Sequence, residues 1–372
     1  MDGNGVAPIP ACEELDQRRI DGFGGVRWAW QELGANARYF FQTPEWMELV
    51  AAWVEDDLAW GAVIDSGRPV AVSVLRHARK GPAGLGPKVL SEVRVADKWS
   101  FTDCLLDAKI DGSNAVELDE VVGASGAWDV LWLGDLRAGS PWLALAVGRA
   151  RVREEPVGGV GILDTPLGAD AWWRMLPKNM RDSIRKARRR IEACGGSEIV
   201  SSTGAELPAA YEEFVALEAS GWKGAAGTAL LQRSAARDLL RDYLCVAGTA
   251  QVRSLRIGDR LAASQLTVRV GGSLVLLKVA YDEQLAHLSP GNVLMADLVE
   301  ECCEDPAVDR IDCTVWQEWH QRWGMVREPT FRLVAFNHRS VLGAIAGSAW
   351  NARRLLSRQR GWRIAEVQGR QS

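Results

Sequence analysis

The sequence lacks the features that would attach it to a membrane or export it. Its 372 residues contain no apolar run near the roughly 18 residues that a membrane-spanning helix needs. Residues 1–19 are acidic and polar and have no apolar core of a secretion signal. Lysine and arginine number 44 against 48 acidic residues, a formal net charge of −4, so the chain as a whole does not attract nucleic acid. We expect a cytoplasmic protein with no DNA partner and no membrane contact.

Metal-binding and common catalytic motifs are also missing. The seven cysteines include no CxxC pair, which predicts reduced thiols and no metal site. The sequence has no GxSxG elbow, no HExxH and no Walker A lysine loop. Hydrolase, metalloenzyme and nucleotidase functions therefore have no support.

The composition is that of a globular α/β protein with more than one unit. Hydrophobic residues make up 47% and charged residues 25% of the chain, so a sizeable core is expected. The length allows two or three domains of about 150 residues each. The glycine-rich segment 154–166 is the best boundary, which predicts domains at 1–160 and 161–372. A similar order of helices and strands in both halves indicates an internal duplication.

Turn residues and hydrophobic periodicity place the elements. The first half predicts a helical region at 25–55, a hairpin over 58–79 turned at Ser66–Gly67, a strand at 127–136 and a helix from Ser140. The second half predicts helices at 170–193, 207–219 and 229–246, then a three-stranded meander turned at Gly258–Asp259 and Gly271–Gly272. A helix from Ser289, a buried strand at 310–316 and a strand at 330–337 complete an α/β fold with a mixed sheet.

Ser289, Pro290 and Gly291 open a helix soon after the meander. Serine can cap the helix, proline fits its first turn, and glycine lets the backbone approach a ligand closely. The N–H groups and partial positive charge of such a helix start suit a phosphate or pyrophosphate. An ordinary capped helix is the alternative.

The helix expected at 170–193 is strongly basic. Its apolar residues recur at helical spacing and form one stripe, and arginines and lysines, among them Arg181 and Arg185, cover the remaining surface. This surface is either a solvated face or a binding face for a polyanion such as a nucleotide-linked donor or a tRNA acceptor stem. The stripe consists of Met180, Ile184, Ala187 and Ile191.

The segment EASGWKGAAGT, residues 218–228, places a tryptophan and a lysine between glycines. Lys223 can neutralise a phosphate or carboxylate, and Trp222 can stack on a flat or apolar group. Glu218 can orient Lys223 or accept a proton from an attacking amine. A surface loop with Trp222 packed back onto the core is the alternative, and we favour a loop that faces a ligand.

Two further segments hold candidate proton-transfer groups. In DCTVWQEWHQRWG, His320 follows Trp316 and Trp319, and a histidine with a pKa of about 6.5 can act as acid or base. Tyr281 and Asp282 end the last meander strand and form the second candidate pair. A structural role for the histidine is the alternative.

Four segments resemble the GNAT superfamily of acyltransferases, in particular the CelD-type GNAT-like domain related to Fem-type peptidyltransferases. They are LPKNMRDSIRKARRRIEACGG, EASGWKGAAGTAL, VAYDEQLAHLSPGNVL and DCTVWQEWHQRWG, and the similarity covers 170–336 well and the N-terminal half loosely. The resemblance implies tandem GNAT-like units, the second better formed, with two splayed strands through 278–281 and 312–316. It also implies an acyl-coenzyme A donor held by Lys278, Ser289, Gly291, Asn292 and Val293.

The resemblance predicts an N-acyltransferase that moves an acyl group from acyl-coenzyme A to an amine of a small molecule, sugar or peptide. The candidate acid–base residues are Glu218, Tyr281, Asp282 and His320, and the candidate substrate contacts are Trp222, Lys223, Arg181, Arg185, Trp316 and Trp319. The usual pyrophosphate loop, Arg/Gln-x-x-Gly-x-Gly/Ala, is absent, and Fem-type relatives take aminoacyl-tRNA. An aminoacyl-tRNA-dependent ligase is therefore the first alternative. A non-catalytic scaffold for envelope or polysaccharide synthesis is the second.

Overall fold

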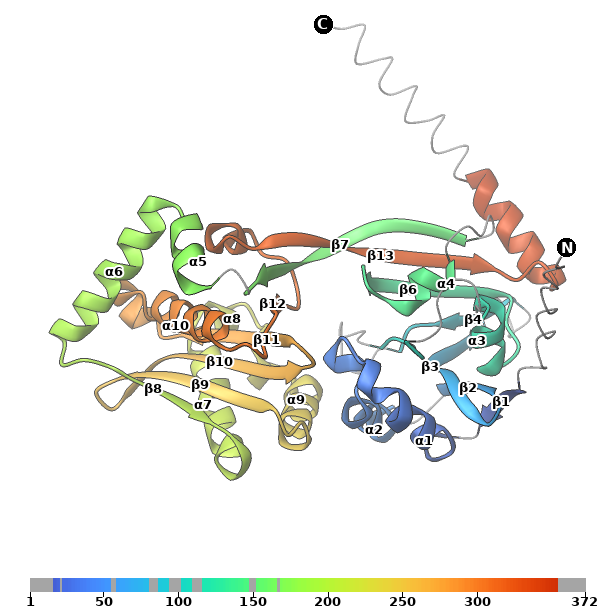
Figure 1. The fold of residues 1–372 in the computed structure, drawn as a ribbon, viewed down its shortest axis with the longest axis horizontal. Coiled ribbons are helices and arrows are strands. Elements are labelled where there is room, and N and C mark those ends of the chain that lie inside the picture. Colours follow the sequence, from blue (N-terminus) through green and yellow to red (C-terminus); the bar gives the residue numbers. More distant parts are fainter. Residues whose placement is uncertain are drawn as a thin grey trace, which may run out of the picture.

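The computed structural model describes residues 16–20, 22–54, 58–79, 86–93, 102–108, 116–146, 152–165 and 168–353. In the first half two helices precede an antiparallel meander, which a helix, a strand and a further helix follow (Figure 1). The elements are β1 (Asp16–Ile20), α1 (Phe23–Leu33), α2 (Pro44–Trp53), β2 (Leu58–Asp65), β3 (Arg68–Arg79), β4 (Lys88–Ser91), β5 (Leu105–Leu106), α3 (Leu118–Ala124), β6 (Val130–Arg137) and α4 (Pro141–Ala146).

The second half repeats this order at greater length. Its strands are β7 (Val152–Asp164), β8 (Glu198–Ser202), β9 (Ala250–Ile257), β10 (Arg260–Val270), β11 (Ser273–Tyr281), β12 (Arg310–Cys313) and β13 (Val326–Phe336). Its helices are α5 (Ala169–Met175), α6 (Lys178–Ala193), α7 (Leu207–Ser220), α8 (Trp222–Ala225), α9 (Ser234–Val246) and α10 (Pro290–Glu304), with short 3₁₀ turns η5 (Leu230–Gln232), η6 (Glu283–Leu288) and η7 (Glu318–Trp323). Residues 341–353 form a further helix.

The described strands belong to one mixed sheet with the order β1-β2-β3-β4-β6-β13-β7-β12-β11-β10-β9-β8, and β5 pairs with β3. In each half an antiparallel meander is followed by a helix and then by a strand that pairs parallel to the last meander strand. The first set is β2-β3-β4, α3 and β6, and the second is β9-β10-β11, α10 and β12. This repeated succession confirms the predicted tandem units and the mixed α/β sheet.

The strand that follows each of these two sets in the chain lies beside the strands of the other set. β7 pairs antiparallel with β12, β13 pairs antiparallel with β6, and the two long strands pair with each other. Figure 1 shows them spanning the space between the lobes. Residues 154–164 of the glycine-rich segment expected as a boundary therefore belong to a strand. A Cβ at Gly158, Gly159 or Gly161 would press on the side chains of Thr330, Arg327 and His320 respectively. The division at 160/161 falls within this strand and stays a prediction.

Two elements differ from the sequence-based expectation. The helix expected over 170–193 is two helices, because Pro177 holds Leu176 in an extended conformation between α5 and α6. The strand expected over 310–316 ends at Cys313. The apolar stripe of α6 is buried as predicted and consists of Met180, Ile184, Ala187 and Ile191.

A buried ion pair connects the two halves across the sheet. The guanidinium of Arg137 on β6 donates to both carboxylate oxygens of Asp312 on β12, and both side chains are almost fully buried. One hydrophobic core, which includes Trp30 and Trp46 from α1 and α2, also takes in Phe214 of α7 and Leu239 of α9. Among the described residues no helix is both long and apolar enough to cross a membrane.

Candidate functional site

β11 and β12 separate and leave an opening in the sheet. Their parallel pairing stops at Leu276 and Cys313, although β11 continues to Tyr281. Beyond β12 the N–H of Trp316 bonds to the carbonyl oxygen of Gly159 on β7, 2.8 Å away. The chain after β12 is thus drawn away from β11, as the predicted splayed strands require.

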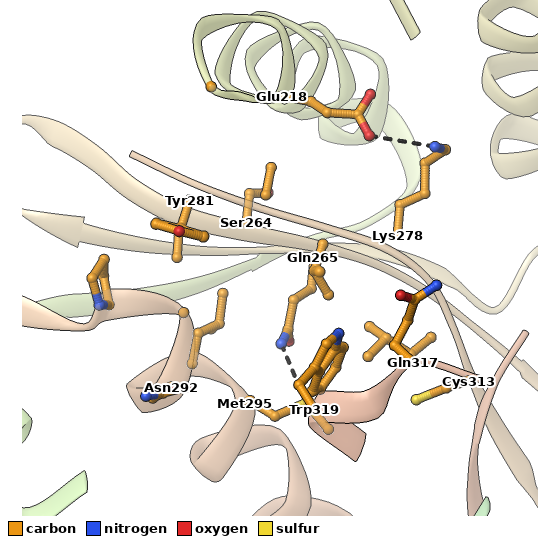
Figure 2. A pocket seen from close by; sticks show the side chains of 18 of the residues that line it. Glu218, Ser264, Gln265, Lys278, Tyr281, Asn292, Met295, Cys313, Gln317 and Trp319 are labelled. Carbon is orange, nitrogen blue, oxygen red and sulfur yellow. Dashed lines mark hydrogen bonds and ion pairs between the residues drawn. The ribbon is translucent and has the colours of Figure 1, made fainter. Parts of the chain in front are cut away.

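A cavity of 850 Å³ occupies this opening. Its walls come from β10 and β11, the end of α7 with α8, the start of α10, and η7. Figure 2 shows that side chains approach from both faces of the sheet: Glu218 and Lys278 lie on the face that α7 covers, and Gln265, Met295 and Trp319 on the face that α10 covers. Most of the predicted site residues line the cavity, namely Glu218, Trp222, Lys223, Lys278, Tyr281, Ser289, Gly291, Asn292, Trp319 and His320.

A buried carboxylate binds two lysines on the α7 face. Glu218 Oε1 accepts hydrogen bonds from Lys223 Nζ at 2.9 Å and from Lys278 Nζ at 3.3 Å, and its Oε2 accepts one from the N–H of Leu230 at 2.8 Å. Burial raises the pKa of Glu218. The two lysines and the N–H of Leu230 lower it by more than burial raises it, so the pKa of Glu218 lies below its ordinary value. Lys223 Nζ also donates to the carbonyl oxygen of Val279, at 3.1 Å. Glu218 is therefore an anion that positions both lysines.

The glycines around Trp222 allow α8 to fold back against α7. A Cβ on Gly224 would overlap the backbone of α7, and a Cβ on Gly221 would lie 3.0 Å from Glu283. The carboxylate of Glu283 accepts the Trp222 N–H at 2.7 Å, which ties α8 to η6. The Trp222 side chain is 60% exposed and lines the cavity, so it does not pack back onto the core.

His320 is held as a neutral ring in the wall of the cavity. Its Nδ1 accepts the N–H of Gln317 at 3.1 Å, and the rings of Trp316 and Trp319 pack against it edge to face. A Cβ on Gly161 would lie 2.6 Å from Nδ1, so glycine is required there. Burial lowers the pKa of His320 to about 4. Because Nδ1 is an acceptor, the neutral ring carries its hydrogen on Nε2 and acts as a donor.

The start of α10 differs from the expected capped helix. Ser289 has a left-handed backbone (φ 53°), and its side chain makes no capping hydrogen bond. Its carbonyl oxygen accepts the N–H groups of Asn292 at 3.1 Å and Val293 at 3.3 Å. Among the amides of Gly291, Asn292 and Val293, that of Gly291 alone lacks a backbone partner in this turn, and a Cβ added to Gly291 would lie 3.7 Å from Tyr281. Val293 is buried and does not line the cavity.

Besides Val293, the predicted site residues that do not line the cavity are Asp282, Arg181, Arg185 and Trp316. The carboxylate of Asp282 accepts hydrogen bonds from Arg260 Nε at 2.6 Å and from the backbone of η6. Arg181 bonds to the carbonyl oxygen of Trp173 at 3.4 Å, and the guanidinium of Arg185 lies over the Trp173 ring. The functional roles of Asp282, Arg181 and Arg185 stay predictions. The role of Trp316 also stays a prediction, because its ring packs against His320 and does not line the cavity.

Three further residues that line the cavity belong to no recognisable sequence motif, namely Gln265, Arg233 and Glu283. The side chain of Gln265 is almost fully buried, and no described residue forms a hydrogen bond with its Oε1. Arg233 precedes α9, and Glu283 opens η6. A polar residue within the apolar meander was the available signal for Gln265. The charged cavity residues are Lys223, Arg233, Lys278 and Arg322 against Glu218 and Glu283.

Comparisons with known proteins agree with this geometry. Residues 178–322 match the family model of the acetyltransferase (GNAT) domain. The solved structure of FemX is similar over 87% of this chain and 98% of that chain, with a TM-score of 0.59 and 11% identity. L-PGS from Bacillus licheniformis is similar over 89% and 96%, with a TM-score of 0.51 and 11% identity. A conserved protein of unknown function from Bacteroides thetaiotaomicron is similar over 86% and 99%, with a TM-score of 0.52 and 9% identity. No curated protein matches at the level of sequence.

Proposed function

From the premise that the chain has a GNAT-like fold related to that of FemX, we propose that it transfers an acyl group from acyl-coenzyme A to an amine. The observation that carries this proposal is the cavity between β11 and β12, which side chains from both faces of the sheet line (Figure 2). A thioester and an amine that enter from opposite faces meet in this opening, and such positioning removes much of the entropic barrier to transfer. The GNAT match over 178–322 supports a donor of this type.

The residues around the opening fit an acyl donor in two respects. Beyond Leu276, no described strand pairs with β11 on the β12 side, so its backbone groups there can bond to the amides of an extended donor arm. Gly291 also presents an N–H at the start of α10. One group on β11 is already bonded, because Lys223 donates to the carbonyl oxygen of Val279. Lys223 therefore limits where along β11 a donor arm binds.

His320 is the residue that we assign to the carbonyl oxygen of the thioester. Attack by the amine places negative charge on that oxygen, and a fixed N–H donor stabilises it. The His320 ring is neutral and carries its hydrogen on Nε2, so it can donate without first gaining a proton. Loss of one such donor lowers kcat by about 10²- to 10³-fold in other acyl-transfer enzymes, and we expect the same range for His320→Phe.

Glu283 is the carboxylate that we assign to receive the proton of the amine. Glu218 is bonded to two ammonium groups, and Asp282 lies outside the cavity. Glu283 lines the cavity, and its Oε1 accepts the Trp222 N–H. Glu283→Gln keeps an oxygen for that N–H but cannot take a proton. We expect it to lower kcat by roughly 10²- to 10⁴-fold at unchanged stability.

A transfer assay tests the proposal. Acetyl-coenzyme A labelled in the acetyl group is mixed with a panel of amines, and titration calorimetry measures coenzyme A binding. We expect saturable binding and amine-dependent transfer that His320→Phe and Glu283→Gln reduce, with Glu48→Gln as a surface control. Absence of both binding and transfer refutes the proposal. It then favours the non-catalytic scaffold, for which Trp222→Ala abolishes partner binding.

An aminoacyl-tRNA-dependent ligase is the second candidate, and α6 is the observation that favours it. Met180 of this helix lines the cavity, so its basic surface begins at the cavity edge. The exposed cations of α6 are Lys178, Arg185, Lys186, Arg189 and Arg190. A helix that binds phosphates in this way makes tRNA affinity strongly dependent on salt.

Charged tRNA binding measured between about 50 and 200 mM salt tests this candidate. We expect the double variant Arg185→Gln/Arg189→Gln to reduce the salt slope by about 2, because each phosphate contact contributes about one. The matched control is Arg237→Gln/Arg241→Gln on α9, where both arginines pair with neighbouring aspartates. A flat salt response in the wild-type protein excludes the ligase.

A further inference from the structure

We propose that the amine acceptor also carries an acidic group, and that this group binds on the α7 face of the cavity, between Arg233 and the lysine pair Lys223 and Lys278. The proposal rests on the proposed transfer to an amine and names the class of that amine. The acceptor is thus an anionic amine, with a carboxylate or a phosphate ester in the same molecule.

The charge balance of the cavity is the first observation. Its wall holds four cationic side chains and two anionic ones, a surplus of two positive charges. Both oxygens of Glu218 are occupied, one by the lysine pair and the other by the N–H of Leu230. A single carboxylate therefore serves two lysines, and burial keeps the pKa of Lys278 below its ordinary value in spite of this carboxylate. An anion that entered here would relieve the surplus charge.

Arg233 is the second observation. Its side chain is half-buried and lines the cavity, and within the described part of the chain its guanidinium forms no ion pair. Arg237 and Arg241, on the helix that Arg233 precedes, pair with Asp238 and Asp242. Arg233 is close enough to Lys278 for its charge to lower the pKa of that lysine. A guanidinium placed in this way can bind a carboxylate or phosphate with two parallel hydrogen bonds.

The position of this cation group relates it to the acceptor and not to the donor. Lys278 lies on β11 just beyond Leu276, where the pairing with β12 ends, so an acid bound there lies next to the opening. The start of α10, where donor phosphates would bind, carries Asn292 on the other face of the sheet (Figure 2). Arg233 acts on Lys278, which lies on the α7 face, so it is available to the second substrate. Because the acid sits beside the opening, a short amine with its acid a few bonds away fits best.

Titration calorimetry with two matched pairs of small amines tests the proposal without any donor present. β-Alanine is compared with β-alaninamide, and O-phosphoethanolamine with ethanolamine, on the wild-type protein, Arg233→Gln and the control Arg241→Gln. We expect the acidic member of at least one pair to bind at least about 10-fold more tightly than the neutral member, because it gains a charge-assisted hydrogen bond to the cationic side chains. The pair that shows the preference distinguishes a carboxylate from a phosphate. The preference should be lost in Arg233→Gln and retained in Arg241→Gln.

A charge reversal gives a second readout. Arg233→Glu should turn the preference toward a cationic partner, with putrescine bound more tightly than ethanolamine. Equal binding of acidic and neutral members in the wild-type protein overturns the proposal, and so does a preference that persists in Arg233→Gln. The transfer assay separates this outcome from the proposed function. Selective binding of acids without acylation of any amine refutes the transfer alone, and efficient acylation of neutral amines refutes the acidic acceptor alone.

Discussion

Replacement of Glu218 by glutamine removes the anion that holds two lysines at the cavity. The carboxylate side chain is fully buried and accepts hydrogen bonds from Lys223, Lys278 and the N–H of Leu230. Glutamine keeps the shape and one acceptor oxygen, but it cannot balance the charges of the lysines. We expect Glu218→Gln to lower the free energy of unfolding and to disturb the α7 face of the cavity.

The magnitude follows from the burial of the three groups. Removal of one partner of a buried ion pair costs about 3–5 kcal/mol. The side chains of Lys223 and Lys278 are 23% and 19% exposed, so water still solvates part of each charge. The lower end, about 3 kcal/mol, is therefore expected. An exposed pair in the same chain sets the scale: Arg27 and Glu48 have side chains 52% and 42% exposed, and Glu48→Gln should cost less than about 1 kcal/mol.

Urea unfolding followed by tryptophan fluorescence measures both variants against the wild-type protein. The folded-state pKa of Glu218 lies below its ordinary value, so its contribution is present above the ordinary pKa and is lost as the pH falls through the folded-state pKa. The difference between the wild-type protein and Glu218→Gln should shrink accordingly at acid pH. Addition of Lys223→Met should recover part of the loss, because it removes one of the two lysine charges. A cost of Glu218→Gln no larger than that of Glu48→Gln would refute the reasoning.

Three further expectations concern His320 and the glycines. The free energy of unfolding should fall as the pH is lowered from about 6.5 to about 4. Over this range the histidine of the unfolded chain binds a proton, whereas buried His320 in the folded chain does not. The urea midpoint of His320→Phe should lack this part of the pH dependence. Gly224→Ala should cost about 1–3 kcal/mol in chemical unfolding, since its Cβ overlaps α7, whereas the control Gly248→Ala has open space and should change stability by less than about 1 kcal/mol. Gly161→Ala should displace the His320 ring and lower kcat with coenzyme A affinity retained, as kinetics and calorimetry can show.

The elements that the sequence predicted are those set by local chemistry. Ser66–Gly67 and Gly271 adopt the positive φ angles that tight turns need, so the hairpin and the meander could be placed from turn residues alone. The buried stripe of α6 follows from spacing, since residues three or four apart share a helix face. The prediction that β11 and β12 separate came from the family resemblance, and the register of the two strands confirms it.

What the sequence could not show depends on contacts between distant segments. The glycines of β7 indicate a domain boundary in the sequence, yet they are needed because neighbouring side chains leave no room for a Cβ. Ser289 is of the residue type that caps helices, but its left-handed backbone turns the side chain away from that role. The sequence allowed Glu218 to orient Lys223, and the structure shows this pair, but nothing in the spacing indicated that Lys278 shares the same carboxylate or that Arg233 lines the cavity. Such facts follow from tertiary packing, which no local pattern encodes.

The site is built by both halves of the chain, although the GNAT match covers 178–322 alone. Gly161 on β7 leaves the space that His320 fills, and Gly159 on the same strand bonds to Trp316 and draws the chain away from β11. Arg137 on β6 binds Asp312, next to the last paired residue of β12. A fragment that begins at 161 lacks Gly159 and Arg137, and its buried Asp312 would have no counter-ion from β6. The pairing of β7 with β12, and of β13 with β6 and β7, is therefore part of the site, because it fixes both the opening in the sheet and the histidine beside it.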